Sequence, residues 1–263
     1  MHLNAPWIGN MEQINNKPIK IITDGDGIVV SATEGIKSVT FEQTDQHPVA
    51  KLIDSSVRML DNGMTATNAI RLVEYACRTC YRSFEYIGEG SGEKLIRSCL
   101  ARKHETPLEH VNFSFEVVCD RAVLAQWTRH RISSFNVESQ RYCNYTKDKF
   151  DDCITIIKPI WFDDAPEDDR QEWINSVTTA AQTYLRLIAG GANPEQARSV
   201  LPNCTKTQFV WTANLREIRH FLELRMSIKA DPEIRKLAHE VFELLINAGY
   251  GIFFEDLMVT QQN

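Results

Sequence analysis

The densest group of polar and cationic side chains in the sequence lies between residues 126 and 142. Three residues that can carry positive charge are consecutive, Arg129-His130-Arg131, and Ser139 and Arg141 follow them. Arginine binds phosphate through paired N–H donors, and a turn rich in hydroxyl and backbone N–H groups adds more. A basic last turn of a helix would explain the three consecutive residues, but it does not explain Arg141. The segment therefore indicates a site for a small anion or a nucleotide.

A second polar stretch runs from His104 to His110 and holds two histidines and two carboxylates in seven residues. A zinc motif of the HExxH type needs both histidines on one helical face, whereas here five residues separate them and Pro107 is one of the five. The stretch is therefore interpreted first as a polar loop that enters a strand. A metal-dependent hydrolase built on His104 and His110 is the alternative, and a chelator would abolish its activity.

A third group lies on a predicted helix over residues 214–228. Arg225 falls within about 20° of Ile218 on the helical wheel, and Asn214 lies on the same line. A cation on an apolar face needs a partner, because a stranded buried charge costs several kcal/mol. Arg225 is therefore expected either in a structural ion pair or facing an anionic ligand. The opposite face, which is expected to be solvated or to meet a second ligand, carries Arg216, Arg219, His220 and Glu223.

Apolar periodicity predicts the elements that hold these groups. Alternation over 110–118 predicts a strand with one buried face, and residues 37–44 predict a shorter one. Asp24-Gly25-Asp26-Gly27 is typical of a hairpin turn. Val49, Ile53, Val57 and Leu60 recur at about 3.6 residues and predict a helix that ends at Asn62-Gly63. Further helices are predicted over 65–82, 93–103, 120–130, 165–189, 214–228 and 231–248, with another start at Asn193-Pro194.

Composition narrows the class of protein. The chain has 263 residues and a net charge of −6, which argues against a protein that mainly binds duplex DNA. No apolar run approaches the roughly 18 residues of a membrane span, and no apolar signal segment opens the sequence. Seven cysteines, an odd number, favour structural thiols over a disulfide framework, and Cys77-Arg-Thr-Cys80 is a lone pair without the second pair of a zinc site. We expect a globular cytoplasmic protein with no membrane or nucleic-acid partner.

Four segments together resemble the flavin-dependent thymidylate synthases. The first is Arg129-His130-Arg131, followed after seven residues by Ser139 and then by Arg141-Tyr142. The others are His104–His110, Ala197–Pro202, and Trp211–Asn214 with Leu222–Arg225. The resemblance covers about residues 37–255 and departs from the family at Val137, where many members carry Glu. Residues 1–36 are interpreted as an N-terminal extension of uncertain order, and residues 37–263 as the catalytic domain.

The resemblance implies a fold and a reaction. The fold is expected to be α+β, a helix-rich single catalytic domain around a mainly antiparallel sheet, assembled into a homotetramer with shared active sites. The reaction converts dUMP to dTMP, with methylenetetrahydrofolate as carbon donor, FAD as redox carrier and NADPH as reductant. The cofactor carries the difficult chemistry, so the protein is expected to bind, orient and polarise.

The resemblance also assigns roles to single residues. Arg225, Ser139 and Arg141 are expected to be catalytic, with Ser139 as a positioning or phosphate-binding hydroxyl because no His-Asp pair lies near it in sequence. No metal ligand is expected. The residues expected to bind flavin are His104, Thr106, Glu109, Arg129, His130, Arg131, Asn214, Arg216 and His220. Those expected to bind the nucleotide are Gln126, Arg129, Glu138, Ser139, Gln140, Arg141, Arg198 and Arg225.

One alternative of a different class uses the same basic segment. A nucleic-acid-binding module could present Arg129 to Arg141 as a cationic patch. Such a module would bind polynucleotide in a salt-dependent way and would show no flavin absorbance. A visible spectrum of the purified protein separates this alternative from the synthase.

Overall fold

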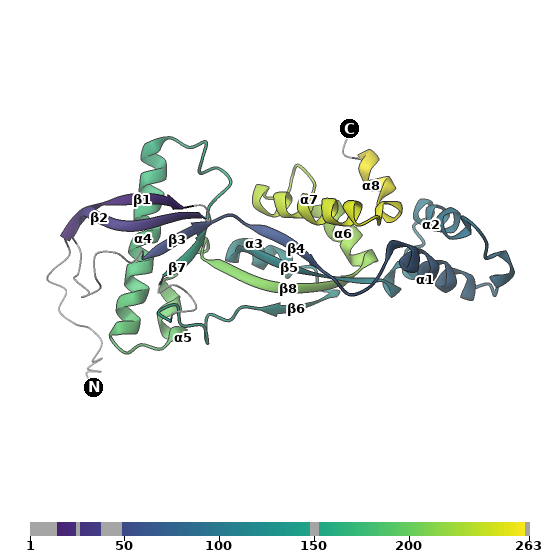
Figure 1. The fold of residues 1–263 in the computed structure, drawn as a ribbon, viewed down its shortest axis with the longest axis horizontal. Coiled ribbons are helices and arrows are strands. Elements are labelled where there is room, and N and C mark those ends of the chain that lie inside the picture. The colour runs from purple at the N-terminus through teal and green to yellow at the C-terminus, as the bar shows by residue number, and fades with distance from the viewer. Residues whose placement is uncertain (1–14, 25–26, 38–48, 148–152, 261–263) are drawn as a thin grey trace. The chain divides into compact units, whose positions relative to one another are not determined.

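The computed structural model describes residues 15–24, 27–37, 49–147 and 153–260 of the chain (Figure 1). The chain divides into two compact units, each built around its own four-stranded sheet. The first unit comprises the residues up to Ser55, Cys119–Ala122 and Glu138–Thr207. The second unit comprises Ser56–Val118, Val123–Val137 and the residues from Gln208 onward.

The sheet of the first unit has the strand order β1-β2-β3-β7. Strands β1 (Asn15–Asp24) and β2 (Gly27–Lys37) are antiparallel, which confirms the predicted hairpin; residues 25–26 of its turn lie outside the described residues. Strand β3 (Ala50–Ile53) pairs antiparallel with β2 and parallel with β7 (Ile154–Ile157). The core of this unit lies between the sheet and helix α4 (Glu167–Ala189), which packs against β3 (Figure 1).

The helix predicted over Val49 to Leu60 is wrong. This segment forms two strands, β3 and β4 (Ser56–Leu60). In β3, the buried residues Ala50 and Leu52 alternate with half-buried ones, which is the period of a strand and not of a helix. Neighbouring strands β2, β7 and β5 supply the backbone partners, and such long-range pairing overrides a short apparent helical periodicity.

The sheet of the second unit has the order β4-β5-β8-β6. Strand β5 (Asn112–Asp120) confirms the predicted strand, whereas β8 (Lys206–Asn214) and β6 (Ser133–Val137) were not predicted. β4 pairs antiparallel with β5, and β6 pairs antiparallel with β8. Phe115, Trp127, Trp211 and Phe221 meet in the core; the rings of Trp127 and Phe221 stack with centroids 4.5 Å apart.

Most of the predicted helices are confirmed within a few residues. In the second unit, α6 packs against α7, and α7 also packs along β4 (Figure 1). The first unit holds α4, α5 (Pro194–Ala197) and the short helix Arg198–Val200. The other helices are α1 (Ala66–Thr79), η1 (Phe84–Tyr86), α2 (Ser91–Ala101), η2 (Thr106–His110), α3 (Arg121–Trp127), α6 (Leu215–Arg225), α7 (Pro232–Asn247), η5 (Gly251–Phe253) and α8 (Glu255–Thr260).

Local capping explains where three of these helices begin. Thr65 caps α1 by accepting a hydrogen bond from the Asn68 backbone N–H. Asn193 and Gln196 form a reciprocal capping box at α5, which confirms the predicted start. Asn214 ends β8 and caps α6, so a single residue turns the chain from the sheet into the helix that carries Arg216, His220 and Arg225.

The α+β class with mostly antiparallel pairing is confirmed, but the strands form two sheets, and β3 and β7 are parallel. The boundary predicted at residue 37 stays a prediction, because residues 38–48 lie outside the described residues, as does most of the strand predicted over 37–44. In the part of the chain that the structure describes, no helix combines the length and apolar character needed to cross a bilayer.

Candidate functional site

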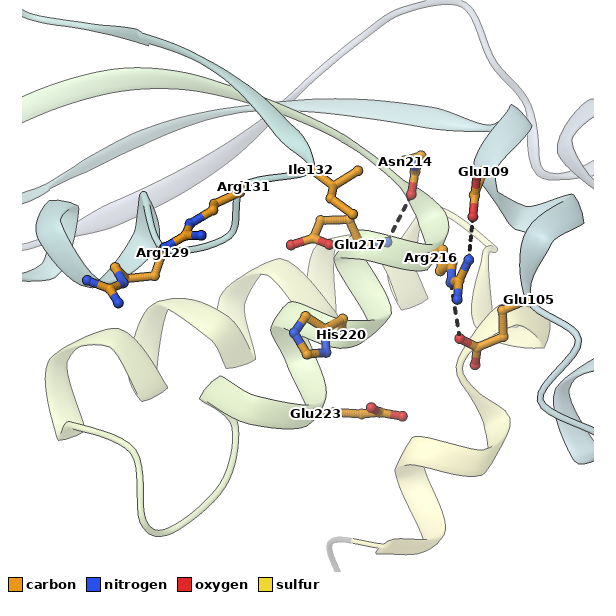
Figure 2. A pocket seen from close by; sticks show the side chains of 10 residues that line it. All are labelled: Glu105, Glu109, Arg129, Arg131, Ile132, Asn214, Arg216, Glu217, His220 and Glu223. Atoms are coloured by element: carbon orange, nitrogen blue, oxygen red, sulfur yellow. Dashed lines mark hydrogen bonds and ion pairs between the residues drawn. The ribbon is translucent and has the colours of Figure 1, made fainter.

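A cavity of about 660 Å³ opens in the second unit beside α6 (Figure 2). The size is typical of sites for small molecules and cofactors. Three segments far apart in sequence form the wall: η2 with the residue before it, the turn between α3 and β6, and α6 with its capping residue Asn214. The lining residues are Glu105, Glu109, Arg129, Arg131, Ile132, Asn214, Arg216, Glu217, His220 and Glu223.

Two arginines at one end of the cavity are available for an anion. Arg129 and Arg131 lie together in the turn that follows α3, and both are exposed (Figure 2). Among the described residues, neither guanidinium forms an ion pair or a hydrogen bond with a protein acceptor. Because guanidinium keeps its charge at any physiological pH, this end of the cavity presents two positive charges that form no direct ion pair with a described carboxylate.

The opposite end carries a third arginine that is already paired. Nη1 of Arg216 contacts Oε1 of Glu109 at 2.5 Å, and its Nε lies 4.0 Å from Oε2 of Glu105 (Figure 2). The two carboxylates hold the Arg216 side chain at the edge of η2. Arg216 therefore offers a ligand less net charge than Arg129 or Arg131.

Arg219 does not lie on a solvated face, so the prediction for this residue is wrong. Its side chain is 1% exposed and donates hydrogen bonds to Asp256 at 2.8 and 2.7 Å and to the carbonyl oxygen of Phe253 at 2.6 Å. Glu105 adds a contact at 3.4 Å. The reason is that the segment from η5 to α8 covers this side of α6, which a helical wheel alone does not reveal.

Arg225 is half-buried, as its position on the wheel predicts, but its partners are not carboxylates. Its Nε donates to Nε2 of His130 at 3.1 Å, and its Nη2 donates to the carbonyl oxygen of Gln126 at 3.0 Å. Among the described residues no carboxylate lies within ion-pair distance of this guanidinium. Burial lowers the pKa of Arg225, yet an arginine remains cationic. The structural ion pair considered for Arg225 is therefore absent among these residues.

His130 lies behind the cavity wall rather than on it. The ring is 4% exposed, and its Nδ1 is 3.3 Å from Oε1 of Glu217. Burial first, and then the charges of Arg225 and His220, lower the pKa of His130 to about 4. The imidazole is therefore neutral at neutral pH.

The nine residues predicted to bind flavin divide into two groups. Six line the cavity: Glu109, Arg129, Arg131, Asn214, Arg216 and His220. Three do not: His104, Thr106 and His130. His104 and Thr106 are exposed, at the end of the loop after α2 and at the start of η2. All nine assignments stay predictions, but the structure brings six of them to one surface.

The residues predicted to bind the nucleotide are divided between the units. Gln126, Arg129 and Arg225 belong to the second unit, and the amide of Gln126 donates to Asp231 at 3.2 Å. The other five belong to the first unit: Glu138, Ser139, Gln140, Arg141 and Arg198. In that unit Arg141 forms an exposed pair with Glu195, with Nε 3.1 Å from Oε1.

Both carboxylate oxygens of Glu138 contact side chains of the first unit. Its Oε1 accepts a hydrogen bond from the Tyr145 hydroxyl at 3.0 Å, and its Oε2 lies 2.6 Å from Nζ of Lys206. Burial, followed by the nearby Glu138 carboxylate, raises the pKa of Tyr145. The carboxylate thus ties the segment after β6 to the start of β8. A role for Glu138 toward the nucleotide stays a prediction.

Glu223 was expected on the helix face that is solvated or meets a second ligand, whereas three other lining residues had no predicted role: Glu105, Ile132 and Glu217. A signal for Glu217 was present. It stands three residues after Asn214, and that spacing is typical of the first turn of a capped helix. In the structure its backbone N–H donates to Oδ1 of Asn214 at 2.9 Å (Figure 2).

No cysteine is among the residues that line the cavity. Cys77 and Cys99 place their sulfur atoms 3.6 Å apart between α1 and α2, and Cys80 is exposed at the end of α1. All seven cysteines are free thiols. No group of three or more His, Cys, Asp or Glu side chains in the described ranges is placed to hold a metal ion.

Comparisons with known proteins identify the fold and the family of this chain. The fold is that of thymidylate synthase X: the crystal structure of that protein from Helicobacter pylori with FAD and dUMP matches with a TM-score of 0.59, at 24% identity, over 76% of this chain and 98% of that one. At this identity the match concerns the fold. A family model described as thymidylate synthase complementing protein matches residues 64–248.

Two relatives carry the name flavin-dependent thymidylate synthase. The protein from Pyrococcus furiosus is 34% identical over 173 residues, which are 65% of this chain and 70% of the relative. The protein from Geobacter sulfurreducens is 32% identical over 188 residues, 69% of this chain and 79% of the relative. The chain belongs to the thymidylate synthase complementing protein family, that of the flavin-dependent thymidylate synthases.

Proposed function

We propose that this chain is a flavin-dependent thymidylate synthase that methylates dUMP to dTMP, with FAD as cofactor and with methylenetetrahydrofolate and NADPH as co-substrates. Family membership supports the reaction. The observation that carries the proposal is the cavity beside α6, where neither Arg129 nor Arg131 is paired with a carboxylate among the residues that the structure describes.

The residues of the cavity fit FAD. FAD carries a diphosphate, and two unpaired guanidinium groups at one end of the cavity match that charge. The volume is within the usual range for cofactor sites. When bound, FAD would supply the two-electron redox chemistry that protein side chains lack. Arg129 and Arg131 would hold the diphosphate, and Asn214, Arg216 and His220 would contact the rest of the cofactor.

Arg225 is proposed to hold the nucleotide. Its contacts to His130 and Gln126 leave donors on Nη1 and Nη2 for a ligand, and no described carboxylate competes for them. A planar fork of donors suits the oxygens of a phosphate or a pyrimidine. Ser139, Arg141 and Arg198 of the first unit are proposed as further contacts to the nucleotide, as the family resemblance implies.

The structure offers no separate observation for a nucleic-acid module. Arg129 and Arg131 line a cavity in the second unit, and Arg141 of the first unit is engaged in an ion pair with Glu195. Polynucleotide binding needs an open cationic surface. The synthase is therefore the function that the site supports best.

The test is FAD binding by the apo protein, followed by dTMP formation. Equilibrium dialysis should show uptake of FAD, and NADPH oxidation should respond to dUMP. Arg129→Ala and Arg131→Ala should each weaken FAD binding at least about tenfold, the effect of losing one charge-assisted hydrogen bond. The control is Arg97→Ala, an exposed arginine of α2 that pairs with Glu255 outside the cavity. A wild-type protein that takes up no FAD would refute the proposal.

Two further expectations complete the proposal, a homotetramer and a cytoplasmic location. Both rest on the resemblance to the family. Light scattering with FAD present should give four times the 30.1 kDa of the chain. A monomer under these conditions would contradict the shared active sites.

A further inference from the structure

His130 is a buried neutral imidazole, and its two nitrogens must therefore play different roles. The ring packs edge-on against Phe221, with centroids 5.0 Å apart, and lies 5.7 Å from the ring of His220. Its pKa of about 4 keeps it uncharged at neutral pH. One nitrogen of a neutral imidazole donates a hydrogen bond and the other accepts one.

The contact with Arg225 shows which nitrogen of the His130 ring is the acceptor. Arginine has donors and no acceptor. Because Nε of Arg225 donates to Nε2 of His130 at 3.1 Å, this nitrogen must present its lone pair. The proton of the ring consequently lies on Nδ1, on the side of the ring that faces Glu217.

Glu217 is the acceptor placed for that proton. Its Oε1 is 3.3 Å from Nδ1, and no other described acceptor is within hydrogen-bond distance of this nitrogen. The N–H points off the line that joins the two atoms, so the pair is close without being a well-aligned hydrogen bond.

Glu217 is itself held firmly. Its side chain is buried, and its backbone N–H is bound by the capping Asn214 in the first turn of α6, where the helix dipole favours an acidic residue. Glu217 and Arg225 stand eight residues apart on one helix, about 12 Å along its axis. The imidazole of His130, which comes from another element, connects them.

We propose that Glu217 is a positioning residue, which acts through His130 to hold the guanidinium of Arg225 in place for the nucleotide. The inference rests on the proposed function, because it needs Arg225 to bind dUMP. Glu217 favours the tautomer of His130 that carries the ring proton on Nδ1, so that Nε2 can accept the hydrogen bond from Arg225. This hydrogen bond fixes the orientation of the guanidinium and of its remaining N–H donors.

The first experiment determines the tautomer of the His130 ring in the absence of any ligand. Nitrogen-15 chemical shifts of the His130 ring in the wild-type protein should show the proton on Nδ1. In Glu217→Ala the shifts should move toward a mixture of the two tautomers. A wild-type ring protonated on Nε2, or a tautomer unaffected by Glu217→Ala, would overturn the proposal whatever the protein binds.

The second experiment measures dUMP affinity of the FAD-loaded protein. Flavin content is measured on every variant, and dUMP affinities are compared at saturating FAD. Glu217→Ala should weaken dUMP binding about tenfold, and Glu217→Gln, which keeps an acceptor oxygen, should return the affinity to within about threefold of wild type. The matched control is Glu243→Gln, an exposed glutamate of α7 outside the cavity. Equal dUMP affinity in Glu217→Ala and wild type would overturn the proposal.

A double variant separates action through His130 from direct contact with a ligand. If Glu217 acts through the imidazole, Glu217→Ala should weaken dUMP binding no further in a His130→Asn background. Additive losses would instead show that Glu217 contacts the ligand directly. Wild-type protein that binds no dUMP would refute the proposed function itself, whereas wild-type binding with additive losses refutes only the positioning role.

Discussion

Arg219 of α6 and Asp256 of α8 form a two-pronged ion pair in which Nη1 and Nη2 lie 2.8 and 2.7 Å from Oδ1 and Oδ2. The arginine is 1% exposed, and a third hydrogen bond joins it to the carbonyl oxygen of Phe253. The pair fastens the C-terminal segment onto the helix that carries the cavity. The Asp256 carboxylate and the Phe253 carbonyl oxygen compensate the charge of Arg219, which allows the guanidinium to be buried.

Arg219→Ala should lower the free energy of unfolding by roughly 2–3 kcal/mol, because the Phe253 carbonyl oxygen and the partly exposed Asp256 carboxylate lose their hydrogen bonds to the guanidinium. Urea denaturation checks the loss. The control is Arg97→Ala, because Arg97 pairs with Glu255 of the same α8 but is exposed. That variant should stay close to wild type. Similar losses in the two variants would show that burial is not what makes the Arg219 pair important.

Arg225→Ala should fold, retain FAD and lose dUMP affinity by more than about tenfold. It should fold because no described carboxylate is stranded when the guanidinium is removed. Arg225→Lys should also bind dUMP poorly, since a point charge does not reproduce a planar fork of donors. Melting temperature, flavin content and dUMP binding are measured on the same preparations. A flavin-loaded Arg225→Ala protein with wild-type dUMP affinity would contradict the assignment.

Stability should fall in mild acid because of His130. Its pKa is about 4 in the folded protein and about 6.5 in an unfolded chain. Between these values the unfolded state binds more protons, so the free energy of unfolding rises with pH across this window and is lost as the pH falls. The loss between pH 7 and 4.5 should be roughly 2–3 kcal/mol.

Chemical denaturation at several pH values measures this dependence. His130→Gln cannot titrate, so its stability should depend less on pH than that of wild type. His239→Gln, a change on α7 outside the cavity, is the control and should keep the wild-type dependence. Identical slopes for wild type and His130→Gln would exclude His130 as the source.

Cys77 and Cys80 should differ sharply in reactivity. Burial, then the hydrogen bond to Cys99, raises the pKa of Cys77 to about 12. The thiolate is the reactive form, so a buried thiol with a raised pKa is inert. Iodoacetamide at pH 8 should alkylate the exposed Cys80 and leave Cys77 unmodified in the folded protein. Peptide mass spectrometry checks this, and equal labelling rates would contradict the burial of Cys77.

Features that depend on a few neighbouring residues were predictable. The start of α5 at Asn193, the alternation of β5 and the helices α1, α6 and α7 all follow from capping or periodicity within one element. The strands β3, β4, β6 and β8 were missed or mistaken for helix. Their hydrogen bonds go to strands distant in sequence, which no short window contains.

For the candidate site, the chemical groups and their order are already evident along the chain: the cationic run Arg129–Arg131, the capping Asn214 and the place of Arg225 on the less polar face of its helix. Which of the charges remain available for a ligand is visible only in the folded protein. Arg216 pairs with Glu109, which lies 107 residues away in the chain, and the buried Arg219 pairs with Asp256. Arg129 and Arg131 form no ion pair with a described residue. The physical reason is that capping and periodicity act over single turns, whereas burial and ion pairing depend on which distant elements pack together.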